Sequence, residues 1–393
     1  MQVKQGVYAI KGVVQHYDWG GTDFIPALLG QVNAAKKPYA EYWMGSHPKS
    51  PSELITENGN RSLADRVQLP FLFKVLDVHD MLSIQVHPTK AAAELEFARE
   101  NSEKIPLDSP KRNYRDENHK PELAYALSEF WLLHGFKPEH ELLAILRAVP
   151  EFAGLHDWFL REGYLGLYKK VMGMPQDEVN TLLQPLLDRI VPLYEKGVLH
   201  REEEDYWAAR AAITFNRNGQ CDRGIFSVYF FNIVKLEPGE AIFQDAGIPH
   251  AYLFGQCMEL MANSDNVLRG GLTSKHIDVK ELMKHVKCEP LEPKKLPGAW
   301  INGAEKVFET PAPDFQLSEV RLNAGGEEQT FISQGPEIWF NLSGSTQFTC
   351  QERELTVQKG EAVYVEPGMA YTLLSATGSR LFKAGLPHST KGE

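Results

Sequence analysis

The stretch Asp245 to Leu253 carries a histidine in a setting that suits metal chemistry. It reads Asp-Ala-Gly-Ile-Pro-His-Ala-Tyr-Leu and follows an apolar run, Phe226 to Phe243, that is broken only by a Pro-Gly turn signal. We expect that run to form a β-hairpin whose second strand ends close to His250. Neutral imidazole is a good ligand for zinc, iron or copper. A single histidine in a β protein is nevertheless more often an ordinary core or surface residue.

A second stretch, Leu82 to Pro88, alternates polar and apolar residues. On a strand, Ser83, Gln85 and His87 would point to one face, and the three aliphatic residues between and before them to the other. Thr89 is a suitable N-cap for a helix that follows. The polar face could equally be exposed to water or line a cleft, so the pattern alone leaves both interpretations open.

The segment Asn118 to Leu123 places charged residues at the start of an apolar run, Leu123 to Leu133. Pro121 restricts the residue before it to an extended conformation, so Lys120 and Glu122 should share one side of the chain. The apolar run predicts a buried strand. A carboxylate at such a position is usually a solvated rim residue, and a site residue is the alternative.

Two further groups of residues could bind a small anionic molecule. Arg269 and Lys275 flank a pair of glycines, which permit close approach of the backbone, and arginine offers a fork of donors. Near the N-terminus, Trp19 and Glu41 lie in aromatic-rich clusters. These residues either line a pocket or belong to turns and loops with no chemical role.

The composition limits the class of protein. At 393 residues the chain fits two or three domains. Its formal net charge of -11 and its pI near 5.7 argue against a nucleic-acid-binding protein. The four cysteines form no CxxC pair, and there is neither a signal-peptide core nor an apolar run of the roughly 18 residues that a membrane span needs. We expect a cytoplasmic protein with reduced thiols that binds neither nucleic acid nor membrane.

The character of the chain changes along its length. Residues 1–136 and 217–300 are predicted to be mainly β. Residues 137–216 are predicted to form an inserted helical domain, because 179–190 places apolar residues on one helical stripe. Pro185 and Pro192 should kink or interrupt that helix rather than prevent it. Residues 301–393 are again β-rich.

An internal echo links the two β-rich parts. The hexapeptide Pro238 to Phe243 can be superposed on Lys359 to Tyr364, an offset that also places His250 on Tyr371. Two related β-barrels, of which only the first holds a metal, would explain this similarity. Chance similarity between short strands is the alternative.

The combination of these strings closely resembles the type I mannose-6-phosphate isomerases, over roughly residues 15–285. The resemblance rests on 82–88, 118–123, 249–253 and 263–275, together with the early Tyr-Asp-Trp-Gly and the segment around Glu41. One departure is Ser274, where many members of that family have proline. The family's fold implies a mainly β chain with an α-helical insertion, in which two cupin-type (jelly-roll) barrels accompany a helical domain.

The resemblance also implies a site. One Zn²⁺ per chain would be bound by Gln85, His87, Glu122 and His250, and Arg269 falls on the family's catalytic arginine. The positions associated with the pocket and the substrate phosphate are Ser83, Lys120, Lys275, Tyr252, Glu259, Asp265, Trp19 and Glu41.

The implied reaction interconverts mannose 6-phosphate and fructose 6-phosphate by moving a proton between C2 and C1 through an enediol(ate). It needs a polarised carbonyl, a general acid/base and groups that bind the phosphate at the far end of the sugar. The residues leave the base open between His119, Glu259, Asp265 and a zinc-bound water. The expected partner is the small sugar phosphate, and the protein is expected to be a monomer or weak homo-oligomer. A cupin oxygenase and a non-catalytic sugar-phosphate sensor are the alternatives.

Overall fold

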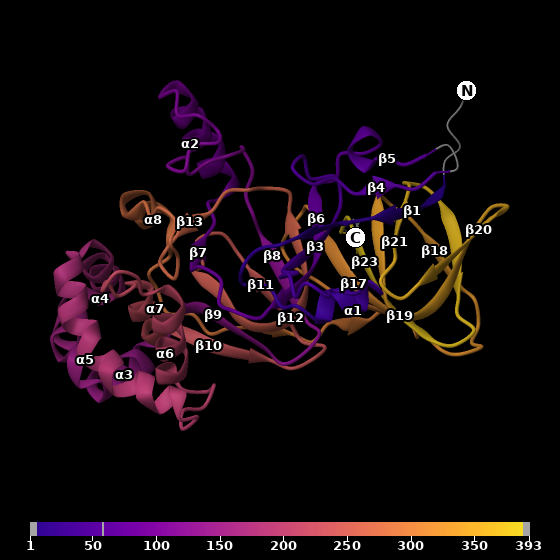
Figure 1. Cartoon of the computed structure of the whole chain (residues 1–393). Coiled ribbons are helices and arrows are strands. Elements are labelled where there is room, and N and C mark those ends of the chain that lie inside the picture. Colours follow the sequence, from indigo (N-terminus) through magenta and orange to yellow (C-terminus); the bar gives the residue numbers. More distant parts are fainter. Residues whose placement is uncertain (1–5, 57–58, 388–393) are drawn as a thin grey trace.

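The computed structural model describes residues 6–56 and 59–387. It contains two β-rich bodies side by side, with helices packed against the outer end of one of them (Figure 1). All strand pairs within the two sheets are antiparallel. The predicted fold class, mainly β with an α-helical insertion, is confirmed.

The first sheet has the order β14-β11-β8-β12-β6-β3-β2, and β7, β9, β10 and β13 attach to it through β12 and its neighbours. Its strands are β2 (Val13–Gln15), β3 (Glu41–Met44), β6 (Phe71–Val78), β7 (Gln85–Val86), β8 (Glu122–Ala126), β9 (Phe130–Phe136), β10 (Phe231–Leu236), β11 (Ala241–Gln244), β12 (His250–Ala262), β13 (Leu268–Arg269) and β14 (Lys295–Leu296). The long strand β12 pairs with four others and therefore organises this body.

The second sheet has the order β15-β16-β17-β23-β19-β21-β1-β4-β5, with β18, β20 and β22 attached. Its strands are β1 (Val7–Lys11), β4 (Glu53–Leu54), β5 (Arg61–Ser62), β15 (Ala299–Trp300), β16 (Glu305–Phe308), β17 (Gln316–Leu322), β18 (Gln329–Ile332), β19 (Glu337–Cys350), β20 (Arg353–Gln358), β21 (Ala362–Val365), β22 (Ala370–Leu374) and β23 (Ser379–Gly385). Three early strands thus join the C-terminal sheet, where Val7 pairs with Val365. The domain boundaries expected above stay a prediction.

The two β-rich bodies share one apolar core. It joins Phe73 of β6 and Leu123 of β8 to Phe340 of β19 and Tyr364 of β21, all with at most 2% of their surface exposed. Burial of apolar surface of this extent is the main stabilising contribution to folding. The second β-rich body is therefore held rigidly against the first.

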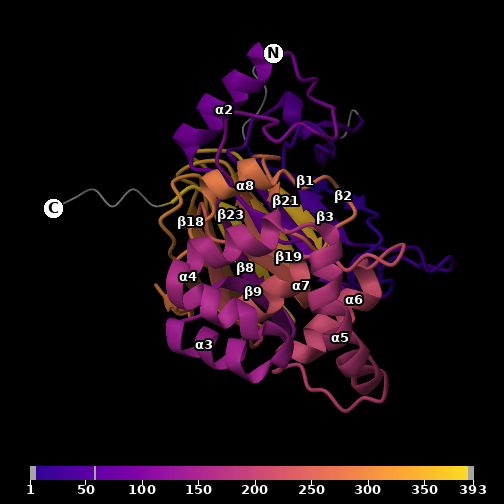
Figure 2. The same ribbon diagram turned by 90° about the vertical axis from the view of Figure 1, so that its left-hand side faces the viewer.

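The helices are α1 (Phe24–Leu28), α2 (Lys90–Ser102), α3 (Glu139–Ala148), α4 (Ala153–Gly173), α5 (Gln176–Glu195), α6 (Glu204–Phe215), α7 (Gly224–Phe230) and α8 (Val279–His285), with 3₁₀ turns at Leu63–Asp65 and Pro150–Phe152. Helices α3 to α6 form one cluster on a single face of the molecule (Figure 2). They bury Leu183 and Trp207 in a core that also contains Ile84, Val86 and Leu268. In the part of the chain that the structure describes, no helix is long and apolar enough to span a membrane.

Two strand predictions are wrong in part. The first five residues of the apolar run 226–243 lie in α7, and only β10 and β11 are strands. Every residue of α7 is buried, and an apolar run without periodicity does not distinguish a buried helix from a strand. The run 123–133 is likewise divided by a turn between β8 and β9.

Other local predictions are confirmed. Thr89 caps α2 by accepting a hydrogen bond from the Ala92 N–H at 3.3 Å. Helix α5 contains the expected apolar stripe and continues through both prolines. The internal echo is present as well, because each copy places a strand between two left-handed glycines, β11 between Gly239 and Gly247 and β21 between 360 and 368.

Candidate metal centre and substrate cleft

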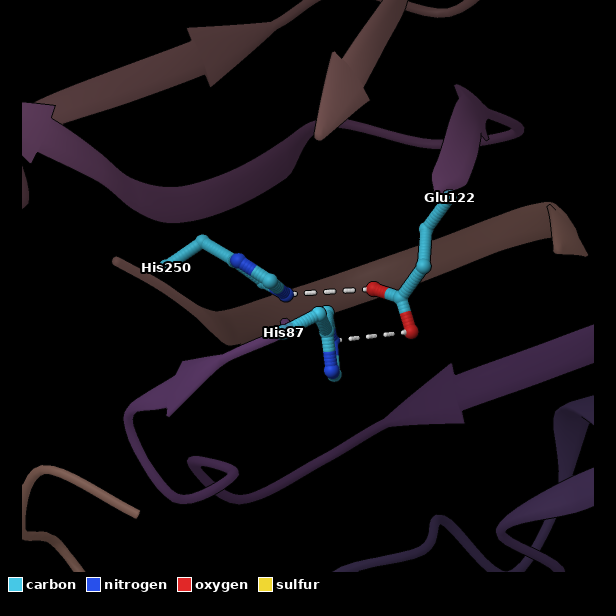
Figure 3. A group of neighbouring side chains, drawn as sticks. All are labelled: His87, Glu122 and His250. Atoms are coloured by element: carbon cyan, nitrogen blue, oxygen red, sulfur yellow. Dashed lines mark hydrogen bonds and ion pairs between the residues drawn. The ribbon is translucent and has the colours of Figure 1, made fainter. Parts of the chain in front are cut away.

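Three buried side chains converge inside the first β-rich body (Figure 3). Glu122 lies between the two histidines, with Oε2 at 3.1 Å from His250 Nε2 and Oε1 at 3.4 Å from His87 Nε2. One ligand atom from each of the three residues lies within 4.8 Å of the others. Ligand atoms bound about 2.1 Å from a tetrahedral zinc are roughly 3.4 Å from one another. The spacing therefore fits a single metal ion of this kind.

The outer ring nitrogens of both histidines are held by the backbone. His87 Nδ1 lies 2.8 Å from the carbonyl oxygen of Asn266, and His250 Nδ1 lies 3.0 Å from that of Ile248. A carbonyl accepts only from a protonated nitrogen, so these contacts leave each Nε2 with a lone pair that faces Glu122. His87 Nε2 is also buried without a hydrogen-bond partner. This donor set is suited to a metal.

The three residues come from different strands that the fold brings together. His250 begins β12 directly after the turn at Gly247, where φ is +82°. It stands opposite Gln85 of β7, and Gln85 stands opposite Arg269 of β13. Glu122 begins β8, in register with β11 and β12. The register thus places Gln85 between His250, a candidate metal ligand, and Arg269, which lines the cleft.

A positive charge also lies beside the Glu122 carboxylate. Lys120 Nζ lies 2.8 Å from Glu122 Oε1, and both residues are at least nine-tenths buried. Burial alone would raise the pKa of Glu122, but the charge of Lys120 opposes burial, and that pKa lies well below its usual range. Glu122 is therefore ionised, as a metal ligand must be.

A second buried charge cluster lies beside this one. Lys74 Nζ lies 2.7 Å from Glu259 Oε2 and 3.5 Å from Glu41 Oε2. Burial, followed by the nearby carboxylates, raises the pKa of Glu259 although Lys74 opposes the shift. Glu259 thus combines a carboxyl group of raised pKa with a position close to the metal-binding residues.

These residues surround a small cavity at the inner end of a larger cleft. The small cavity has a volume of about 50 Å³ and the cleft about 690 Å³. Glu41, Leu82 and Gln85 line both, so the two spaces adjoin each other. The predicted site residues at the cleft are Trp19, Glu41, Ser83, Gln85, Arg269 and Lys275. Those at the small cavity are Glu41, Gln85, Lys120, Glu122, His250, Tyr252 and Glu259.

The alternation expected for 82–88 is confirmed at 83–86 only, because Leu82 also lines the cleft and His87 is fully buried and lines neither cavity. Ser83 and Gln85 line the cleft, while Ile84 and Val86 are fully buried in the core shared with the helices. The helical cluster therefore holds the apolar side of this segment, and its polar side faces the cleft.

The outer part of the cleft is electropositive. Burial and the charge of Arg115 lower the pKa of Arg269, and burial, Arg269 and Arg115 do the same for Lys275. Among the described residues, neither Arg269 nor Lys275 has an acidic partner within ion-pair distance. A cluster of uncompensated cations in a partly buried cleft favours an anionic ligand such as a phosphate.

The loop that carries these cations is held by the segment before α7. Asp222 accepts hydrogen bonds from the N–H groups of Leu272 at 2.8 Å and Thr273 at 3.1 Å. A Cβ added at Gly271 would meet the Gly224 backbone at 2.3 Å. The expectation that the glycines let the backbone approach an anion is therefore unsupported at Gly271, because Gly271 packs against Gly224.

Three of the predicted residues lie outside both cavities: His87, which is fully buried, Asp265 and His119. Asp265 is paired with Lys49, whose Nζ lies 2.7 Å from Asp265 Oδ2, and its other oxygen lies 3.6 Å from His47 Nε2. His119 Nε2 lies 2.7 Å from Asp314 Oδ2 in the second β-rich body. Among the three side chains considered as the base, only Glu259 lines the small cavity.

Several residues of this site were not identified from the sequence. Lys74 is a charged residue inside the apolar run of β6, which is a signal that could have identified it. Arg115 lies in the charged stretch 111–117, whose composition is that of an ordinary solvated loop. Asp222 and Asn266 act through backbone contacts, and no sequence pattern marks such a role.

Comparison with known proteins gives a consistent result. Residues 7–139 match the family model for the phosphomannose isomerase type I catalytic domain. The mannose-6-phosphate isomerase of Salmonella typhimurium is 37% identical over 392 residues, covering 93% of this chain and 96% of the relative. Mannose-6-phosphate isomerase 1 of Arabidopsis thaliana is 33% identical, covering 95% and 92%.

Solved structures agree with the sequence comparisons. The crystal structure of the Salmonella typhimurium mannose 6-phosphate isomerase bound to fructose 6-phosphate and zinc superposes with a TM-score of 0.85 at 32% identity, covering 97% of this chain and all of that chain. A zinc-bound structure of a mannose 6-phosphate isomerase gives the same TM-score and coverage. Similarity at this level extends over nearly the whole of both chains. The chain therefore belongs to the type I phosphomannose isomerase family.

Proposed function

We propose that this protein is a zinc-dependent aldose-ketose isomerase that interconverts mannose 6-phosphate and fructose 6-phosphate. The observation that carries the proposal is the buried group His87, Glu122 and His250 at the inner end of a cleft whose outer part holds Arg269 and Lys275. A metal and an anion site joined by one cleft suit a phosphorylated sugar with a reactive carbonyl at the opposite end. The names of the relatives support the same reaction.

We propose that zinc is held by His87, Glu122 and His250, with Gln85 as a fourth ligand. When bound, zinc supplies a Lewis acid that polarises a substrate oxygen. Lys120 is paired with Glu122 at 2.8 Å and keeps the ligand carboxylate ionised and in place. The two backbone contacts on Nδ1 keep the histidine rings aimed at the metal position.

The remaining residues bind the substrate and transfer its proton. Lys275 and Ser83 bind the phosphate at the outer part of the cleft, and Arg269 stabilises the negative charge that develops on the enediolate. Trp19, Glu41, Tyr252 and Asp265 are assigned to substrate binding or to its support. Each residue here is a proposal to be tested by substitution.

We assign the proton transfer to Glu259, because it is the acid/base candidate that lines the small cavity. A proton leaves C2 of the aldose and is returned to C1, while a hydroxyl proton moves from O2 to O1, so that the atoms balance. A carboxyl group whose pKa is raised by burial is matched to accept and return a proton near neutral pH.

The same proposal covers organisation and location. Residues 1–136 with 217–300 are assigned to the catalytic cupin domain, 137–216 to the helical domain and 301–393 to the metal-free barrel, whose sheet also takes in β1, β4, β5 and β15. The protein works in the cytoplasm as a monomer or weak homo-oligomer on a small sugar phosphate.

The direct test is the conversion of mannose 6-phosphate to fructose 6-phosphate by the purified protein. Activity should be lost on chelation and regained with zinc, with one zinc bound per chain. A zinc-loaded protein that does not convert the substrate would refute the isomerase proposal. Oxygen consumption with iron or manganese, or sugar-phosphate binding without turnover, would then identify the oxygenase or the sensor.

A further inference from the structure

The second β-rich body reaches the active-site segment through one carboxylate. Asp314 lies in the connection between β16 and β17, and its Oδ2 is 2.7 Å from His119 Nε2. The two side chains are only 15% and 21% exposed. A partly buried contact of this geometry holds its two groups more firmly than an exposed one does.

Asp314 is rigidly placed. It follows Pro313, and its neighbours Ala312 and Phe315 are buried in the apolar core that joins the two β-rich bodies. Because proline fixes φ and the flanking side chains are packed, the carboxylate has little freedom to follow a movement of His119. It therefore acts as a fixed anchor.

His119 stands next to the part of the chain that carries the site. Lys120 follows it and is turned into the small cavity, where it contacts Glu122. Asn118 precedes it and donates a hydrogen bond to the Asn263 carbonyl at 3.2 Å. The segment 118–121 is thus held by β12 on one side and by the second β-rich body on the other.

We propose that Asp314 is a positioning residue of the active site, which acts through His119 to place Lys120 and Glu122. The proposal rests on the isomerase function proposed above, and it gives the second β-rich body a role beyond packing. The Asp314 carboxylate touches neither the cleft nor the small cavity, so its effect has to pass through the imidazole that it holds.

The test is a double-mutant cycle. Asp314→Asn keeps the shape of the side chain and removes its charge, and we expect kcat/KM to fall about tenfold, as for other residues that orient a ligand from behind. In a His119→Asn background the same change should have no further effect. Zinc content and Tm should stay at the wild-type values throughout. Glu309→Gln, an exposed carboxylate in the same connection, is the matched control.

The position of Lys120 provides a readout that does not need turnover. The ¹³Cε signal of Lys120, assigned by its loss in Lys120→Arg, should shift in Asp314→Asn and stay in place in Glu309→Gln. A wild-type kcat/KM in Asp314→Asn, equal losses in both backgrounds, or an unmoved Lys120 signal would overturn the proposal. Failure of the wild-type protein to isomerise would refute the proposed function instead, and the lysine signal would still decide the role of Asp314.

Discussion

Replacement of Arg269 by alanine separates the chemistry of the cleft from the binding of the metal. The Arg269 side chain lines the cleft, and in the described structure it contacts none of the three metal-binding residues. Its backbone pairs with Gln85, and alanine keeps that pairing. We therefore expect the zinc content to stay near one per chain while turnover falls.

The size of the loss follows from the charge that is removed. A hydrogen bond from a charged group contributes about 1.5–3 kcal/mol, which corresponds to a fall in kcat of roughly 10- to 150-fold. An interaction made in the transition state should lower kcat and kcat/KM together. Lys275 remains in Arg269→Ala and continues to bind the phosphate, so KM should change less. Arg269→Lys should recover only part of the rate, because lysine keeps the charge and loses the fork of donors.

The assay pairs initial rates of mannose 6-phosphate conversion with zinc content measured by mass spectrometry on the same samples. Arg353→Ala, an exposed arginine of β20, is the matched control and should resemble the wild type in both. Equal loss of zinc and activity in Arg269→Ala would refute this reasoning and make Arg269 a structural residue.

Three further perturbations test other parts of the structure. His87→Ala should lower zinc affinity by more than about 100-fold, since residues that merely orient ligands already contribute 10- to 100-fold; retention of one zinc in dialysed protein would contradict the proposed ligand set. Asp222→Ala removes two hydrogen bonds to the loop that carries Lys275, so it should raise KM about tenfold with a smaller change in kcat. An unchanged KM would show that the loop keeps its conformation without these hydrogen bonds. Burial would raise the pKa of Glu281, but hydrogen bonds from His285, Lys284 and Tyr114 lower that pKa from its ordinary 4.5 to about 2. The stability that this carboxylate contributes should be present above pH 4.5 and lost as the pH falls towards 2, so urea unfolding at pH 6 and pH 3 should differ less in Glu281→Gln than in the wild type.

Local features of the fold could be predicted from short stretches of sequence. The alternation at 83–86, the Thr89 cap and the stripe of α5 are set by neighbouring residues through the geometry of strand and helix. The internal echo could also be predicted from the sequence. The turns on either side of the strand each contain a glycine with positive φ, which restricts the choice of residue at both ends. The helix at 226–230 could not be predicted from the sequence, since burial on all sides removes the periodicity that distinguishes a helix from a strand.

The residues of the site were identified through the resemblance to a known family, whereas their arrangement in space could not be predicted from the sequence. Glu122 and His250 are 128 residues apart in the sequence, and no spacing rule joins them. His119, considered beforehand as a base, is turned towards Asp314, and Glu259 is turned into the small cavity. Which way a side chain faces depends on the partner that packs against it, and that partner comes from a distant part of the chain.

The sequence by itself determined the ligand types, the cationic loop and the division into β-rich and helical parts, because residue chemistry and short-range periodicity are local properties. Only the tertiary structure decided that β1, β4 and β5 join the C-terminal sheet, that Lys74 lies between two buried carboxylates, and that the second β-rich body reaches the segment of Lys120 through Asp314. These features depend on strand register and on charge pairing between distant segments, which become definite only when the whole chain is packed.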